Sequence, residues 1–170
     1  MTDFLFSEFY LEDLAGEEPP AIHPRFTEMI HYLAAVAPAG RLPGRQHIDP
    51  CDFPSMLGLI NLVDVERRNT AMQFRFRLVG EEQTRAAGRN ITGLVVEDAV
   101  VPALVERIKG NMRKVVSTRL PIYDRFPMPH PDRQFIDSQR MYYPLAADGK
   151  TINMLLILNA YDRISLRAVG

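Results

Sequence analysis

The chain contains little of what marks a secreted or membrane protein. It has one cysteine and no tryptophan among 170 residues. A single cysteine, Cys51, cannot form an intramolecular disulfide, which fits a reducing compartment. No apolar run approaches the roughly 18 residues of a membrane-spanning helix, and the amino terminus carries acidic residues instead of a basic leader. We therefore expect a cytoplasmic protein.

A strong charge of either sign is also missing. Lys and Arg total 20, Asp and Glu total 21, and the formal net charge is −1. Such a balance gives no general attraction to nucleic acid or to a membrane surface, and we expect neither as a partner. The length predicts one domain with an additional arm.

Residues that could bind haem or a photoactive flavin are few or misplaced. The histidines are His23, His31, His47 and His130. None lies in the long helix expected after Asp98, which argues against haem. A photoactive flavin would need a reactive cysteine, and residues 81–93, after the strand at 71–80, contain none. Cys51 precedes the first strand and is interpreted as a small buried thiol. We expect His47 to bond within its own loop, and the identity of any cofactor stays open.

Catalytic motifs are missing as well. The sequence has no cluster with metal-ligand spacing, no Gly-x-Ser-x-Gly nucleophile and no glycine-rich phosphate loop. We therefore predict that the protein is not an enzyme. The alternative is a small enzyme in which Asp137, near Tyr143, performs acid/base chemistry in a cavity.

What the sequence does contain is a clear strand at residues 71–80, AMQFRFRLVG. Polar residues alternate there with an apolar set, Met72, Phe74, Phe76 and Leu78. Strict alternation is typical of a β-strand with one buried face. A core or a pocket is expected over Phe74 and Phe76.

Further elements follow from similar patterns. Helical spacing predicts a helix at 24–37 and a long helix that starts at Asp98 as N-cap and carries apolar residues through Val115. A short helix at 81–87 stops at Gly88. Strand patterns occupy residues 59–66, 119–125, 134–145 and 151–160. The last run is apolar at consecutive positions, which predicts a central strand covered on both faces.

The first 20 residues are acidic and apolar at once, with no Lys or Arg. They could form an amphipathic helix that docks on its own domain or on a partner, or they could be disordered. We divide the chain into an acidic arm and capping helix at 1–40, a domain at 41–162 and a tail at 163–170.

Two strands, a helical crossover and three strands resemble the order of elements in a PAS domain. The segments RQHIDPCDFPSMLGLINLVDV at 45–65 and FRFRLVGEEQTRAAGRNITG at 74–93 are similar to the single-domain PAS proteins of alphaproteobacteria. The resemblance covers about residues 41–162. It implies an α+β fold with a five-stranded antiparallel sheet in the order 2-1-5-4-3, a helical crossover and an N-terminal helical cap.

The same resemblance implies a stand-alone sensory or regulatory module that acts by small-ligand binding, by protein–protein interaction, or by both. PAS domains use their N-terminal caps to dimerise. We therefore expect a homodimer formed through the N-terminal helix, and a signalling protein is a candidate partner. A ligand-free interaction scaffold is a further alternative.

A ligand would bind between the sheet and the long helix. The candidate lining residues are apolar, aromatic or sulfur-containing: Phe74, Phe76, Met112, Val115, Tyr123, Met141, Tyr143 and Met154. Arg75, Gln139 and Tyr143 are expected to orient a polar ligand. Two alternatives stay open: the candidate side chains simply fill the core, or Arg75 faces outward with Arg77 and binds a partner.

Overall fold

The computed structural model describes residues 10–11, 22–127 and 137–161, with only the backbone at positions 10, 11, 127 and 137. Most of the acidic arm, His130 and the tail at 163–170 lie outside the described residues. Within the described part, no helix combines the length and the apolarity needed to cross a membrane.

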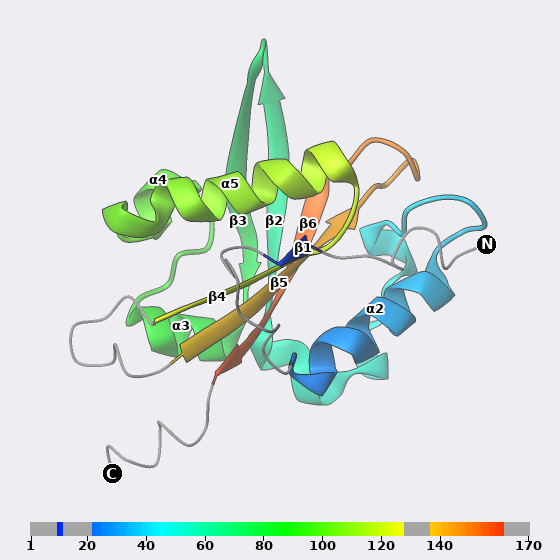
Figure 1. Cartoon of the computed structure of the whole chain (residues 1–170), viewed down its shortest axis with the longest axis horizontal. Coiled ribbons are helices and arrows are strands. Elements are labelled where there is room, and N and C mark those ends of the chain that lie inside the picture. The colour runs from blue at the N-terminus through cyan, green and yellow to red at the C-terminus, as the bar shows by residue number, and fades with distance from the viewer. Residues whose placement is uncertain (1–9, 12–21, 128–136, 162–170) are drawn as a thin grey trace.

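The described chain forms one sheet and the helices that cover it (Figure 1). The helices are α2 (Pro24–Val36), α3 (Glu81–Ala87), α4 (Val96–Ala99) and α5 (Pro102–Thr118), with 3₁₀ turns η1 (Arg45–His47), η2 (Pro50–Asp52) and η3 (Pro54–Leu59). The strands are β1 (Tyr10–Leu11), β2 (Ile60–Arg68), β3 (Ala71–Val79), β4 (Ile122–Pro127), β5 (Asp137–Leu145) and β6 (Met154–Tyr161).

The sheet has the strand order β1-β4-β5-β6-β2-β3. Counted from β2 onward, its five antiparallel strands follow the order 2-1-5-4-3, which confirms the fold expected from the sequence. The central strand is β6, and residues 154–160 are all buried, as the continuous apolar run predicted. At the other edge, Tyr10 and Leu11 add a short parallel strand beside β4, so this part of the arm is a strand and not a helix.

The two faces of the sheet are covered by different helices. The face that we call inner lies under α5, where Arg107 of the helix pairs with Asp124 of β4. The opposite, outer face lies under α2, where the Tyr143 hydroxyl of β5 donates to the Phe26 carbonyl at 2.9 Å. Figure 1 shows α5 crossing the strands, with the tip of the β2–β3 hairpin projecting beyond it.

A β-bulge in β3 corrects the predicted alternation. Phe74 and Phe76 are buried as expected, but the pairing shifts between Leu62 and Val63, which leaves Arg77 as an extra residue. One extra residue moves the following side chains to the opposite face. Leu78, predicted to be buried, is therefore 45% exposed.

The turn from β3 into α3 depends on the absence of a side chain at Gly80. Its N–H donates to the buried Asn61 Oδ1 at 3.0 Å. A Cβ atom at this position would lie 2.3 Å from the carbonyl oxygen of Gly58, inside van der Waals contact. Glycine thus permits the close approach of two backbones that starts the helical crossover.

The long helix begins later than its sequence pattern predicted. Asp98 is not an N-cap: it lies within the short helix α4, and α5 starts at Pro102. The residue before a proline is disfavoured in the helical conformation. Val101 is accordingly extended, with φ −58° and ψ 140°, and separates the two helices.

Candidate functional site

A cavity of about 420 Å³ lies between the inner face of the sheet and helices α3, α4 and α5. Its apolar wall includes Phe76, Ile91, Ala99, Leu104, Ile108 and Phe126. Its polar lining from the strands and α3 consists of Asn61, Gln83, Ser138, Arg140 and Tyr161. The volume lies within the range of small-molecule sites, and a mainly apolar wall with a few convergent polar groups is their usual composition.

Arg140 of β5 is the most unusual of these polar groups because it is only 8% exposed. Its Nε donates to Asn159 Oδ1 at 2.8 Å, and the amide of Asn159 in turn donates to the Leu59 carbonyl at 3.0 Å. The guanidinium also lies 5.1 Å from the centroid of the Phe126 ring. Hydrogen bonding and stacking together fix the orientation of the guanidinium group.

A second arginine reaches the same ring but is neutralised. Arg107 lies 5.6 Å from the Phe126 centroid and holds the fully buried Asp124 through two hydrogen bonds of 2.8 and 2.6 Å. Asn111 donates a third bond to the same carboxylate at 2.8 Å. This cluster links α5 to β4, and the negative charge of Asp124 compensates the positive charge of Arg107. Arg140 forms no ion pair with a carboxylate of the described residues.

Two buried hydroxyls near Arg140, those of Ser138 and Tyr142, have no hydrogen-bond partner in the part of the chain that the structure describes. Asn111 and Arg140 lie near enough to influence the Tyr142 hydroxyl, yet neither meets hydrogen-bond geometry, and burial raises the pKa of Tyr142. Natively buried hydroxyls are usually paired, so an unpaired one at a cavity requires an explanation.

Tyr161 closes the cavity at the end of β6. Its hydroxyl donates to Gln83 Oε1 of α3 at 2.9 Å. Burial raises the pKa of Tyr161, although the nearby positive charge of Arg140 acts to lower it. The neutral phenol is therefore the form that links the sheet to the helical crossover.

The residues predicted to line this space are only partly found there. Phe76 lies in the cavity wall. Phe74, Met112 and Val115 are buried on the same side of the sheet but outside the wall, where they fill the core. These three side chains therefore occupy the position that the alternative interpretation expected, in which the candidates fill the core.

Five further candidates lie on the opposite, outer face, which corrects the prediction: Tyr123, Gln139, Met141, Tyr143 and Met154. The physical reason is the phase of the alternation in β4 and β5, which the sequence pattern alone did not fix. Tyr123 and Phe26 of α2 form an edge-to-face contact with centroids 5.8 Å apart, and the Tyr123 hydroxyl donates to Gln139 at 3.1 Å. Gln139 and Tyr143 therefore cannot orient a ligand in the inner cavity.

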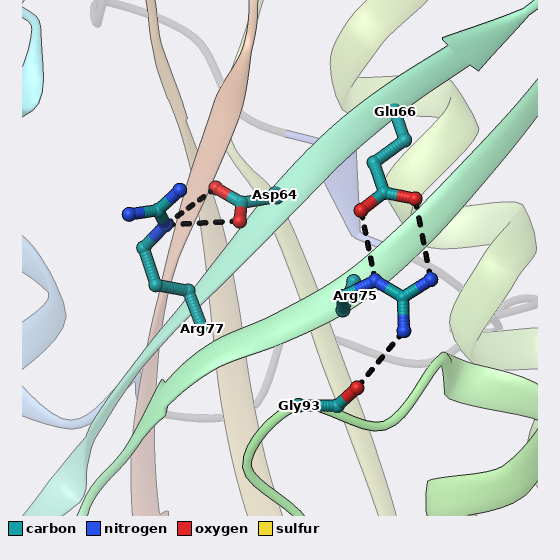
Figure 2. A network of polar contacts seen from close by, with 5 residues as sticks. All are labelled: Asp64, Glu66, Arg75, Arg77 and Gly93. Carbon is teal, nitrogen blue, oxygen red and sulfur yellow. Dashed lines mark hydrogen bonds and ion pairs between the residues drawn. The ribbon is translucent and has the colours of Figure 1, made fainter.

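Arg75 also lies away from the cavity. Figure 2 shows its guanidinium paired with Glu66 at 2.8 Å and donating to the Gly93 carbonyl at 2.9 Å, while Arg77 pairs with Asp64 at 2.9 Å. The outward-facing alternative is thus the correct one for Arg75. Because both arginines have carboxylate partners in their own chain, they give no support to a docking surface for an acidic partner.

The acid/base pair considered for an enzyme is not formed. Asp137 and Tyr143 stand at opposite parts of β5, six residues apart. An extended strand separates such positions by roughly 20 Å. Tyr143 is also buried under α2, and desolvation raises its pKa well above the usual value.

Cys51 differs from its prediction, whereas His47 agrees with it. Cys51 is exposed because the η2 turn lies at the surface, and the negative charge of Asp49 raises the pKa of its thiol. The Nδ1 atom of His47 accepts from the Gly44 N–H at 2.9 Å, within its own loop as expected. Among the described residues there is no group of three His, Cys, Asp or Glu side chains that could hold a metal ion.

These elements define a small α+β domain with an antiparallel sheet, a helical crossover and a cavity between them. The sequence matches the PAS domain family over residues 22–159, and the chain therefore belongs to that family. PAS domains are sensory modules, and this is the class of function that the family assigns. A search of the curated proteins found no match.

The solved structures that are similar to this chain include two sensor proteins. One is a LOV protein of Rhodobacter sphaeroides, with a TM-score of 0.46, 11% identity, and coverage of 67% of this chain and 68% of that one. The other is a sensory box sensor histidine kinase from Vibrio cholerae, with a TM-score of 0.43, 12% identity, and coverage of 85% of this chain and 98% of that one.

Proposed function

We propose that this PAS domain is a sensor that binds a small molecule in the cavity on the inner face of its sheet. The observation that supports the proposal is the cavity of about 420 Å³, whose apolar wall is interrupted by the buried Arg140 and Ser138. Concave sites with this composition are where proteins bind small ligands.

A ligand in this cavity would touch the elements that are held least firmly. The cavity is lined by Ala86 of α3 and Ala99 of α4, and these helices have only seven and four residues. None of the α3 residues is fully buried. Elements with little buried surface open most readily, so a ligand that favours one arrangement of α3 and α4 shifts their population.

The response would reach other proteins through the surface of the domain. The apolar side of α2, with Phe26, Met29, Ile30 and Leu33, is buried against its own sheet. A homodimer through this helix would therefore use the opposite side, where Glu28 and His31 are exposed. This homodimer stays a prediction. Light scattering of the wild-type protein and of Glu28→Arg tests it, and we expect the substitution to weaken the dimer.

Native mass spectrometry after incubation with a small-molecule extract of the host cells tests the proposed binding. We expect a retained mass on the wild-type protein and its loss in Ala86→Trp, which fills the cavity. Ala35→Trp, on the exposed side of α2, is the matched control and should retain the ligand. If each of the three proteins shows only the mass of its unbound chain, the result contradicts ligand sensing at this site.

A further inference from the structure

We infer that the cavity recognises a small, singly charged carboxylate with an apolar body, held by Arg140 and Ser138. This inference rests on the proposed function, because it names the chemical class of the ligand in the same cavity. It is carried by the charge, burial and hydrogen bonding of the two side chains.

The charge of Arg140 is not compensated within the described residues. Asp124, its neighbour across the β4–β5 pair, already accepts bonds from Arg107, Asn111 and the Arg125 N–H. Arg140 keeps only the neutral Asn159 as a hydrogen-bond partner. A buried guanidinium without a counterion is unfavourable, so an anion that enters the cavity is bound in place of the missing carboxylate.

The guanidinium is also oriented before any ligand binds. Asn159 holds Nε, and the Phe126 ring supports one face of the group. The terminal nitrogens make no hydrogen bond to the described residues, although Arg140 lies in the cavity lining. Two free N–H groups on one planar fork match the two oxygens of a carboxylate.

Ser138 supplies a second group on the same face. It stands two residues before Arg140 in β5, which places both side chains on the inner face, roughly 7 Å apart along the strand. Its buried Oγ lacks a partner in the described chain and lies in the cavity lining. A carboxylate bound by Arg140 gives this hydroxyl the acceptor that it lacks.

The surroundings select a monoanion with an apolar body. Among the charged residues of the lining only Arg140 is buried, whereas the exposed Arg89 donates to the backbone carbonyls of Asp98 and Ala99. One buried positive charge balances one negative charge, and Ile91, Leu104 and Ile108 provide an apolar wall. The exposed carboxylate of Asp98 at the cavity disfavours a second negative charge, as a phosphate monoester would bring, whereas Glu97 is already paired with Lys109.

The test compares sodium benzoate with benzamide, its neutral counterpart of similar shape, by NMR titration of the full chain. We expect benzoate to bind about tenfold or more tightly than benzamide, since only the anion pairs with the guanidinium. Arg140→Met should weaken benzoate binding by a similar factor, and Arg140→Lys should weaken it less. Arg77→Met, which removes a surface arginine paired with Asp64, should leave benzoate affinity unchanged.

Equal binding of benzoate and benzamide to the wild-type protein would overturn the inference, and so would unchanged benzoate affinity in Arg140→Met. No binding of either compound would overturn it too. The comparison of the two compounds uses the wild-type chain, so it stands even where an Arg140 variant fails to fold. The proposed function fails separately, when native mass spectrometry finds no retained mass from cell extract.

Discussion

The two faces of the sheet differ in how they use polar residues, and two adjacent tyrosines show the difference. On the outer face, the Tyr143 hydroxyl donates to the Phe26 carbonyl of α2. On the inner face, the Tyr142 hydroxyl has no partner in the described chain and lies near the cavity with Arg140. Both side chains are fully buried. The outer face is thus packed for stability, whereas the inner face keeps polar groups unsatisfied around an open volume.

Such a division explains how a small domain can hold a ligand site without losing its fold. Burial of α2 against the outer face contributes apolar contacts that do not depend on a ligand. The inner face can then retain a cavity and a buried charge, each of which lowers stability. Each prediction below uses a matched pair of substitutions, and the first three compare the two faces.

The largest difference is expected from two leucines. Leu33→Ala removes a fully buried side chain between α2 and the outer face and should lower the free energy of unfolding by about 3 kcal/mol. Leu104→Ala enlarges a wall that already borders the cavity and should cost less than about 1 kcal/mol. Denaturant unfolding of both variants measures the values. Equal losses would show that the inner face is packed as tightly as the outer one.

The second comparison concerns two arginine–carboxylate pairs. Asp124→Asn leaves Arg107 without its buried counterion and should cost about 3 kcal/mol. Asp64→Asn breaks the more exposed pair with Arg77 and should cost less than about 1 kcal/mol. Thermal unfolding ranks the two variants. A mild loss for Asp124→Asn would mean that this cluster does not anchor α5.

For the two adjacent tyrosines, we expect smaller changes in the free energy of unfolding, and the two changes should differ in sign or only one should be a loss. Tyr143→Phe removes a satisfied buried hydrogen bond and should destabilise the protein by about 1 kcal/mol. Tyr142→Phe removes a buried hydroxyl without a partner and should be neutral or stabilising. Chemical denaturation distinguishes the two outcomes, and a destabilised Tyr142→Phe would reveal a hydrogen bond at that hydroxyl.

The smallest expected effect is electrostatic. The Arg75 side chain lowers the pKa of Glu66, so this carboxylate adds stability that is present at neutral pH and is lost as the pH falls through its lowered pKa. In Arg75→Gln the pKa of Glu66 should rise toward its ordinary value, as NMR titration would show. Arg68→Gln is the control because Arg68 is the weaker influence on Glu66. An unchanged pKa in Arg75→Gln would mean that the pair is open in solution.

Local patterns in the sequence predicted most of the elements, whereas the strand order of the sheet came from the resemblance to PAS domains. The helix at Pro24–Val36, the strand at Ala71–Val79 and the central position of β6 follow from apolar spacing alone. Two features were missed because they depend on backbone geometry: the start of the long helix and the bulge in β3. Pro102 breaks the helical pattern after Asp98, and the bulge at Arg77 reverses the side of Leu78.

The candidate site was predicted less well, because it depends on which face each strand presents. Aromatic and methionine residues of β4 and β5 were assigned to the cavity, but the structure places them under α2. Polar residues inside apolar strands were the signal that could have located the site: Ser138 and Arg140 two residues apart, and Asn159 within the run LLILNA. Buried polar residues need partners, so such positions indicate the face where something polar binds.

Methyl NMR spectroscopy of the wild-type protein, titrated with the small-molecule fraction of host cells, tests the central claim most directly. The account predicts shifts at Ile91, Leu104 and Ile108 on the inner face, with Leu33 and Leu156 on the outer face unchanged. Shifts confined to the outer-face methyls, or none at either face, would contradict a ligand site between the sheet and helices α3–α5.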